Sequence, residues 1–492
     1  MPAVIVATCP VLAWFVLTRL GTGTPTYAFI GVLGLIVAVY VGLYHPLWLY
    51  WAFAVILAGL PFGTFPGIHV PLYLAFGPAI VLAAIIYPRT ETPFHPLEKA
   101  ILVLVFAGGV SVIATSFSLG GFYQYGKWSI MTLVAVALTR LSREDLERFG
   151  RIFVVVSTAN ALWGILLATV DKTQKSFFIL RPFGYDVARV EEGVRNGEQH
   201  LVNWAYGADG SKAIRLGGTW IAGNGASIAF LVTIVICMVL FHGWRRIVML
   251  VILSVALLLT LSRQSIFTLM VGLALVAIFH SVRARYRWYA AGTFATLIVL
   301  AFSVPYIRDR LLSSFSKHDP GGEARRASLS DFPNVVGGHW LFGLGWSRPE
   351  FKSGAASYAL NLISNAPLLH VYRAGIFTGL AFLAILIIGC VISFRALRSD
   401  SLPFAVYGGV FIADCFVGLQ LDHGVTDVPQ TILCFSVLLA FLVYVDRLLR
   451  EQVRPPIGEQ VIAGDLPPAS SDLHTKPHSE GESRLDRPTV AR

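Results

Sequence analysis

The chain has 492 residues, of which 55% are hydrophobic and only 13% are charged, and its mean hydropathy is +0.69. Soluble globular proteins carry about 25% charged residues, so this composition excludes that class and indicates a polytopic membrane protein. The formal net charge of +10 comes from basic residues in short loops that suit anionic lipid head groups. We therefore expect the lipid bilayer, and no nucleic acid, as a partner.

Apolar segments long enough to cross a bilayer recur along the chain. A spanning helix needs roughly 20 apolar residues, which gives about fourteen candidate spans. They lie near residues 3–18, 26–44, 47–62, 68–87, 100–119, 122–139, 150–170, 219–241, 246–261, 264–281, 288–305, 366–393, 402–420 and 428–446. The first apolar stretch lacks the basic segment and cleavage site of a signal peptide, so it is predicted to be a span. We predict an all-α transmembrane helical bundle of about 12–14 spans within residues 1–450.

Arginine residues gather in alternate short loops. These loops contain Arg140, Arg143, Arg148 and Arg151; Arg245 and Arg246; Arg283, Arg285 and Arg287; Arg395 and Arg398; and Arg447 and Arg450. Cytoplasmic loops carry an excess of basic residues, so all of these loops are predicted to be cytoplasmic. With fourteen spans, both termini are cytoplasmic as well.

Two long polar connections, about 171–218 and 306–365, then face outward. Each is too long for a simple connection and is expected to carry function. The tail over 451–492 is rich in Pro, Ser, Gly and charge, which predicts a disordered cytoplasmic extension. The five cysteines lie in apolar segments without paired spacing, so neither disulfides nor a zinc site is indicated. We predict no metal or other cofactor.

Three polar clusters can be placed on the outward face: Arg215, Ser262-Arg263 and Ser364-Asn365. The glycines that follow Arg215, at 217, 218, 223 and 225, are predicted to let the backbone approach a ligand closely. Charge held against hydrocarbon is costly, and cations collected at one depth usually bind an anion. Around Arg263 a tight turn must separate two apolar runs, and a pyrophosphate would suit its planar fork of donors. The alternatives are an Arg215 that reaches phospholipid head groups and an Arg263 that only anchors the turn.

Further candidates follow toward the C-terminus. The second outer loop carries Arg325 and Arg326, and the span after it carries His370 and Arg373. A histidine so far along a helix is more often packed and hydrogen-bonded than catalytic. The pair Asp422-His423 offers a carboxylate beside an imidazole, which can raise the basicity of the ring. A solvated turn is the simpler interpretation of that pair.

Four stretches carry a family resemblance: RLGGTWIAGNGASIA after Arg215, LSRQSIFTLMVG around Arg263, the loop from Arg325 through WLFGLGW, and the motif of Ser364, Asn365, nine residues, Gly375 and Thr378. They resemble the O-antigen ligase and O-antigen polymerase family. In that family the last motif begins with histidine, where this chain has Ser364. An ordinary serine hydroxyl cannot accept a proton near neutral pH, so another residue, such as His339 or His423, has to supply that function if the chain is active.

The resemblance implies an enzyme of the bacterial cytoplasmic (inner) membrane that transfers or polymerises glycans carried on a polyprenyl diphosphate. The diphosphate would be held by Arg215, Arg263 and one of Arg325 or Arg326. An acceptor hydroxyl, from a glycan or a lipid-anchored sugar, would attack with inversion and without a metal ion. The candidate catalytic residues are His423, Asp422, Ser364 and Asn365.

Ligase and polymerase activities share this donor and are not separated by the sequence. Two other functions stay open: a transporter or flippase for lipid-linked oligosaccharides, and a non-catalytic protein that binds the lipid-linked glycan. A transporter would place ionisable groups near the bilayer midplane and show repeated halves. Here the clusters gather at one surface, which favours transfer chemistry.

Overall fold

The computed structural model describes most of the chain between residues 37 and 453. The described residues are 37, 40–65, 68–87, 92–115, 118–171, 175–185, 203–206, 212–280, 292, 295, 299, 308, 329–346, 363, 365–421 and 424–453. The chain divides into two units, Met1–Leu449 and Arg450–Arg492, and the following concerns the first. The predicted spans near 3–18 and 288–305, most of 26–44 and nearly all of the predicted tail lie outside the described residues.

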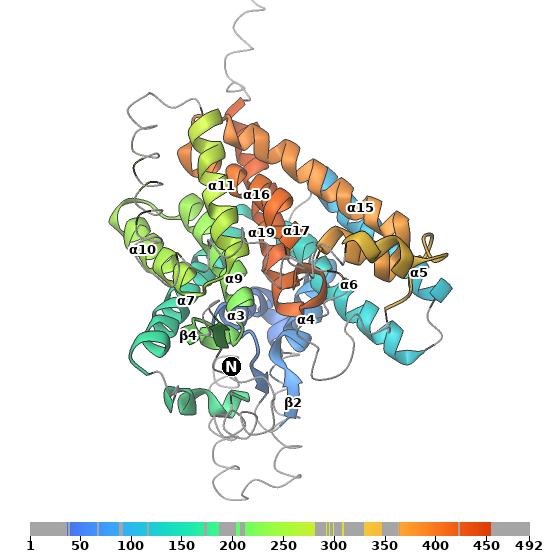
Figure 1. The fold of residues 1–492 in the computed structure, drawn as a ribbon, viewed down its shortest axis with the longest axis horizontal. Helices are drawn as coiled ribbons and strands as arrows, with labels where there is room; N and C mark the ends of the chain where they lie inside the picture. Colours follow the sequence, from blue (N-terminus) through green and yellow to red (C-terminus); the bar gives the residue numbers. More distant parts are fainter. Residues whose placement is uncertain are drawn as a thin grey trace, which may run out of the picture. The chain divides into compact units, whose positions relative to one another are not determined.

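Long helices form the described part of the first unit, and this confirms the predicted polytopic helical bundle (Figure 1). Every predicted span from 47–62 onward, apart from 288–305, coincides with a helix. The long helices are α3 (Pro46–Gly59), α4 (Leu72–Ile86), α5 (Pro96–Thr115), α6 (Leu119–Thr139), α7 (Arg143–Thr169), α9 (Gly223–Leu240), α10 (Gly243–Leu259), α11 (Arg263–Phe279), α15 (Ala366–Leu397), α16 (Leu402–Ala413) and α19 (Pro429–Val453).

Short elements join these helices. They are the antiparallel hairpins β1 (Thr64–Phe65) with β2 (Ile68–Pro71) and β3 (Asn203–Tyr206) with β4 (Lys212–Arg215), the 3-10 turns η1 (Lys175–Phe183) and η2 (Gly218–Trp220), the π-helical segment η3 (Asp414–Gly418), the short helices α17 (Leu419–Leu421) and α18 (Gly424–Asp427), and a helix over 329–336. Within the described residues, six helical stretches are long and apolar enough to cross a membrane. The total of about fourteen spans stays a prediction.

Helix starts follow ordinary capping chemistry. The Ser142 hydroxyl precedes α7 and accepts the Asp145 N–H at 3.2 Å, and the Ser118 hydroxyl does the same for Gly121 at 3.3 Å before α6. Such caps satisfy backbone donors that have no partner within the helix. Helices α3, α15 and α16 have proline in their first turn, where its fixed φ angle is already helical, and α15 has a side-chain cap as well.

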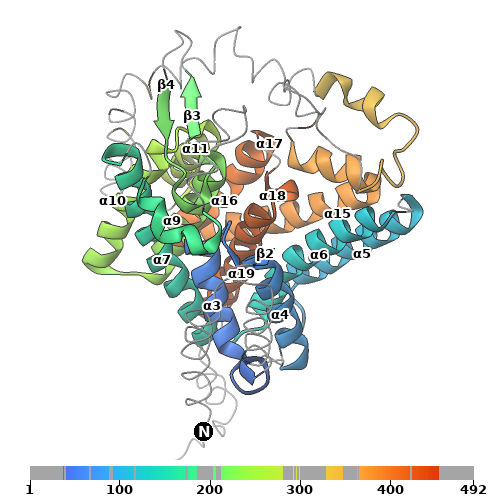
Figure 2. The same ribbon diagram turned by 90° about the horizontal axis from the view of Figure 1, so that it is seen from below.

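The helices of the first unit pack as a closed series of neighbours. Helix α3 packs on α7, α7 on α9, α9 on α16, α16 on α15, α15 on α5, α5 on α6, α6 on α4, and α4 on α3. Figure 2 shows α5 and α6 side by side along α15. Helix α10 covers α7 and α9, whereas α11 lies mainly against α16.

Helix α19 runs through the middle of this series. Its residues from Leu433 to Val445 are all buried, as expected for a helix that is apolar on every side. The Ser436 hydroxyl donates to the Met131 carbonyl of α6 at 2.9 Å, and a Cβ atom on Gly150 of α7 would clash with the ring of Phe441. Contacts with α6 and with α7 therefore fix the position of α19 among the surrounding helices.

A buried carboxylate at one end of the first unit holds two of the predicted cytoplasmic arginines. Glu98 is fully buried, pairs with Arg140, and lies 3.5 Å from Arg447. It also accepts the His95 N–H at 2.6 Å. Arginines from α19 and from the residue after α6 thus share one acid, which agrees with their prediction on one side of the membrane.

A second carboxylate lies at the same end. Asp446 of α19 is fully buried, and its Oδ2 atom lies 2.9 Å from Nε2 of His95. Its Oδ1 atom lies 3.1 Å from Arg395, another predicted cytoplasmic residue. The charged end is defined here by Glu98 and Asp446 with their basic partners.

The first predicted outer loop begins at the other end of α7, where η1 packs on the connection before β1. The Tyr185 hydroxyl donates to the Thr219 carbonyl at 3.0 Å and accepts the Phe62 N–H at 3.2 Å, while its ring stacks on Phe177. Burial raises the pKa of Tyr185 well above its ordinary value, so the phenol stays a neutral donor. These bonds tie the loop to the segment that contains Arg215.

Candidate functional site

Arg215 lies against the turn that precedes Arg263. Strand β4 ends at Arg215, whose Nε donates to the Thr260 carbonyl at 2.9 Å, and the next residue, Leu216, donates its N–H to the Leu259 carbonyl at 2.9 Å. The Arg215 guanidinium also donates to Oδ1 of Asn224 at 2.6 Å. Two of the three predicted polar clusters, 48 positions apart in the sequence, are therefore neighbours.

The turn itself is tight, as predicted, and the structure shows that it is also buried. Helix α10 ends at Leu259 and α11 begins at Arg263; between them, Thr260 and Ser262 are almost fully buried. Arg263 is partly exposed at the first position of α11. The turn separates two helices that pack on different neighbours, which makes it a helix break rather than a packed hairpin.

Two residues beside Arg215 and Arg263 hold a strained backbone. Leu261 in the turn has φ of 52°, and Ile221, just before α9, has φ of 58°. Non-glycine residues with positive φ cost roughly 1–3 kcal/mol each and are concentrated at functional sites. Leu261 directly follows Thr260, and Ile221 lies three residues before Asn224, so each strained residue is close in sequence to an acceptor of the Arg215 side chain.

One of the glycines after Arg215 makes room for its side chain. A Cβ atom on Gly223 would lie 2.9 Å from Arg215 Nε and 3.0 Å from the Thr260 carbonyl oxygen. The sequence predicted that these glycines let the backbone approach a ligand. In the structure, Gly223 lets the guanidinium lie across the first turn of α9, so the glycine positions the arginine.

Asn365, from the third cluster, begins α15. Its Oδ1 atom accepts the Leu368 N–H at 3.0 Å, and its Nδ2 donates to Gln420 of α17. The side chain thus caps a helix and joins it to the segment after α16. The other predicted catalytic residues, Ser364, Asp422 and His423, and the predicted phosphate ligands Arg325 and Arg326 lie outside the described residues.

The glycine-rich loop and the glycine of the family motif interlock. Helix α15 is broken at Gly375, which has φ of 82° and ψ of 179°. The loop over 340–346 lies in this break: Leu344 N–H donates to the Tyr372 carbonyl at 2.7 Å, and Ile376 N–H donates to the Trp340 carbonyl at 2.8 Å. A Cβ atom on Gly375 would clash with the Leu341 carbonyl. The motif therefore needs glycine for close backbone contact and for positive φ.

A second cationic group lies at the start of α15, and the site prediction did not include it. Arg373 is buried, pairs with Asp427 of α18, donates to the Thr426 carbonyl at 3.0 Å, and lies over the Trp346 ring. Lys127 of α6 lies close enough to interact electrostatically with both Arg373 and Asp427. An arginine within an apolar span was the signal in the sequence, but its partner is 54 residues away.

The histidines near this group differ in accessibility. His370 is buried, its Nδ1 lies 2.9 Å from the Ala366 carbonyl, and its ring stacks on Phe382. This agrees with the predicted packing role. His339 is exposed in the second outer loop.

The contacts around Arg215 and those around Arg373 are connected through the first turns of α9 and α19. A Cβ atom on Gly225 of α9 would touch Thr431 of α19, whose hydroxyl donates to the Gly424 carbonyl of α18. Gly424 lies three residues before Asp427, the partner of Arg373. Arg215 and Arg373 therefore belong to one end of the bundle. Thr431 is 15 residues from Asp446 along α19, which places that end roughly 20 Å from the charged end.

Comparison with known proteins identifies the region that carries these features. Residues 248–383 match the family model described as O-Antigen ligase. No curated protein matches the chain. The matched stretch contains Arg263, the loop over 340–346, Asn365 and the helix break at Gly375, whereas Arg215 precedes it. Over residues 248–383, a little more than a quarter of its length, the chain is therefore similar to the O-antigen ligase family.

Proposed function

We propose that this protein transfers or polymerises glycans carried on a polyprenyl diphosphate at the outer face of the bacterial cytoplasmic membrane. The family match supports membrane glycan assembly of the O-antigen ligase or polymerase type. The observation that carries the specific proposal is the contact of Arg215 with the turn before Arg263. That contact places two guanidinium-bearing residues at one end of the bundle, beside strained backbone.

The arginines would bind the diphosphate of the donor. In the proposed reaction the acceptor hydroxyl oxygen forms a bond to the anomeric carbon, and the bond between that carbon and the phosphate oxygen breaks. Negative charge develops on the leaving diphosphate, and guanidinium groups fixed in advance stabilise it without a metal ion. Arg215 and Arg263, with one of Arg325 or Arg326, are the proposed ligands, and their forked donors fit phosphate oxygens.

The acceptor proton needs a base. We assign this role to His423, with Asp422 beside it to raise its basicity, because Ser364 stands where the family has histidine. Asn365 is assigned to positioning, since it joins the start of α15 to Gln420 of α17. Inversion at the anomeric carbon is the simplest outcome, because the acceptor attacks from the face opposite the leaving diphosphate.

Deletion of the gene, followed by analysis of surface and lipid-linked glycans, tests the proposal. Loss of polymer length with single repeat units still attached to the surface acceptor identifies a polymerase. Intact polymer that stays on the lipid carrier identifies a ligase. An unchanged surface glycan, with no accumulation of lipid-linked donor, contradicts the proposal.

A further inference from the structure

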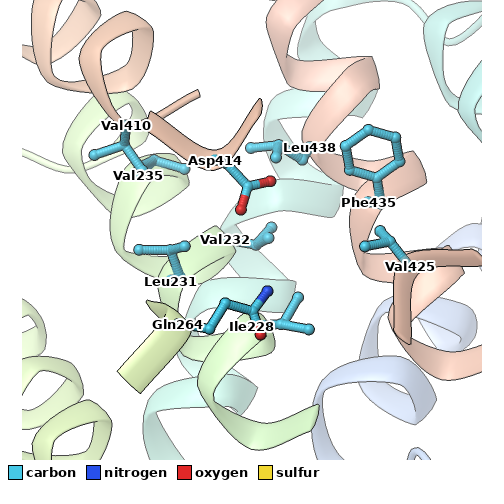
Figure 3. Close-up of a pocket in the computed structure, with 10 residues that line it drawn as sticks. All are labelled: Ile228, Leu231, Val232, Val235, Gln264, Val410, Asp414, Val425, Phe435 and Leu438. Atoms are coloured by element: carbon cyan, nitrogen blue, oxygen red, sulfur yellow. The ribbon is translucent and has the colours of Figure 1, made fainter. Parts of the chain in front are cut away.

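A small cavity lies between α9, α11, α16, η3, α18 and α19. Eight of its ten lining residues are apolar, and the other two are Gln264 of α11 and Asp414 of η3 (Figure 3). The space open to the centre of a water molecule is about 20 Å³, enough for one water or one small ion. In Figure 3 the carboxyl group of Asp414 and the amide of Gln264 point into this cavity from opposite ends.

The polar groups at this cavity lack partners. Gln264 is 7% exposed, and Thr268, which lies one turn further along α11 and beside the cavity rather than in its lining, is fully buried. Among the described residues, Gln264 Oε1 and Thr268 Oγ1 have no hydrogen-bond partner. Within the described part of the chain, the Asp414 carboxyl group makes no hydrogen bond or ion pair either. Buried polar groups in proteins are nearly always paired, so two unpaired ones near a partly buried carboxyl group require an explanation.

The local backbone brings two of these oxygen atoms together. Asp414–Gly418 is a π-helical segment, in which the Leu419 N–H bonds back to the Asp414 carbonyl. Such segments are rare and frequently occur at functional sites. A Cβ atom on Gly418 would clash with Oδ1 of Asp414 and lie 3.2 Å from Oγ1 of Thr268. Glycine at 418 therefore lets the carboxylate and the hydroxyl both lie close to the space that a larger side chain would fill.

The chemistry of these groups selects the ligand. All the candidate donors are oxygen atoms, which suit hard cations rather than transition metals. A carboxylate within apolar surroundings needs a counter-charge, and calcium takes six to eight oxygen ligands and usually several carboxylates. The described residues contain no group of three His, Cys, Asp or Glu side chains that could hold a metal ion. A single carboxylate at so small a cavity matches one cation that carries a single positive charge.

We propose that Asp414, Thr268 and Gln264 bind one monovalent cation of about the size of sodium in this cavity. The ion joins α11 to η3, and Gln264 directly follows Arg263. Occupancy therefore fixes the start of α11, where the Arg263 guanidinium projects.

The test measures thermal unfolding of the full-length protein in detergent, in sodium, lithium, potassium or choline chloride at equal ionic strength. In the wild type we expect sodium to raise the unfolding temperature saturably above its value in choline. Asp414→Asn is expected to lose this sodium-dependent shift entirely. Thr268→Val keeps the shape of the side chain but removes one oxygen, and should need a higher sodium concentration for the same shift.

Asp331→Asn is the matched control, because Asp331 is an exposed aspartate outside the cavity; it should keep the full shift. Equal unfolding temperatures in sodium and choline for the wild type overturn the proposal and favour a protonated Asp414 with a trapped water. A sodium shift that survives in both Asp414→Asn and Thr268→Val overturns the assignment of the site. If Asp414→Asn does not fold, Thr268→Val decides alone. The assay reads ion binding and not glycan transfer, so its outcome leaves the proposed function untouched.

Discussion

Replacing Arg263 with alanine is expected to abolish glycan transfer while the protein still inserts into the membrane. If its guanidinium stabilises charge on the leaving diphosphate, its removal should slow transfer by about 10²–10³-fold, the loss typical when one such donor is removed. The measurement is the initial rate of glycan transfer in membranes from cells that contain equal amounts of wild-type or variant protein.

Two further variants separate charge from folding. Arg263→Lys keeps the positive charge but loses the planar fork of donors, so it should retain intermediate activity. Arg148→Ala removes an arginine with a 57% exposed side chain that pairs with Glu144 on its own helix, and should leave the rate unchanged. Full activity in Arg263→Ala would mean that this residue only anchors the turn between α10 and α11.

Replacing Glu98 with glutamine is expected to destabilise the protein severely. Glu98 is fully buried and is shared by Arg140 and Arg447. Removal of one partner from a buried ion pair costs about 3–5 kcal/mol, because the opposite charge stays buried without compensation. The free energy of unfolding, measured by denaturant titration in mixed micelles, should fall by about that amount.

Glu144→Gln provides the comparison for Glu98→Gln. Its side chain is 84% exposed and forms only an i,i+4 contact with Arg148 at 4.0 Å. Exposed pairs of this kind contribute about 0.3–0.5 kcal/mol, so the unfolding free energy should change by no more than that. Equal losses in the two variants would show that the Glu98 cluster does not stabilise the fold.

The bundle could be predicted because its signals are local. Apolar length identified the helices from α3 onward, and the interruption at Ser262-Arg263 predicted the turn between α10 and α11. The arginine pattern grouped Arg140, Arg395 and Arg447 on one side, and their convergence around Glu98 and Asp446 is consistent with that grouping. The length of the apolar segments and the positions of the basic residues are sufficient to predict the helices, the turn and the grouping of these arginines.

The candidate site was only partly predictable, because it depends on contacts between distant segments. The sequence could place Arg215 and Arg263 on the same face, but not the bond from Arg215 to the Thr260 carbonyl. Nor could it pair Arg373 with Asp427. Such pairings depend on how the helices pack, and a single sequence carries no direct signal for them.

The glycine spacing in the sequence matched the family pattern, but the sequence did not show why glycine is needed at these positions. The segment before Trp346 and the glycine at 375 matched a family pattern, yet their physical role appears only when the loop lies in the break of α15. Gly223 was assigned to ligand approach, whereas it accommodates the Arg215 side chain. At both positions, glycine leaves space that is filled by other atoms of the protein rather than by a ligand.

Binding of undecaprenyl diphosphate to the purified protein tests the central claim most directly. Native mass spectrometry in detergent would compare it with undecaprenyl monophosphate for the wild type, for Arg215→Ala combined with Arg263→Ala, and for Arg148→Ala. A charge-assisted hydrogen bond contributes about 1.5–3 kcal/mol, so the double variant should lose at least about tenfold in affinity for the diphosphate. Wild type and Arg148→Ala should bind the diphosphate equally, and more tightly than the monophosphate. Equal affinity of all three proteins for the diphosphate would contradict a diphosphate site at Arg215 and Arg263.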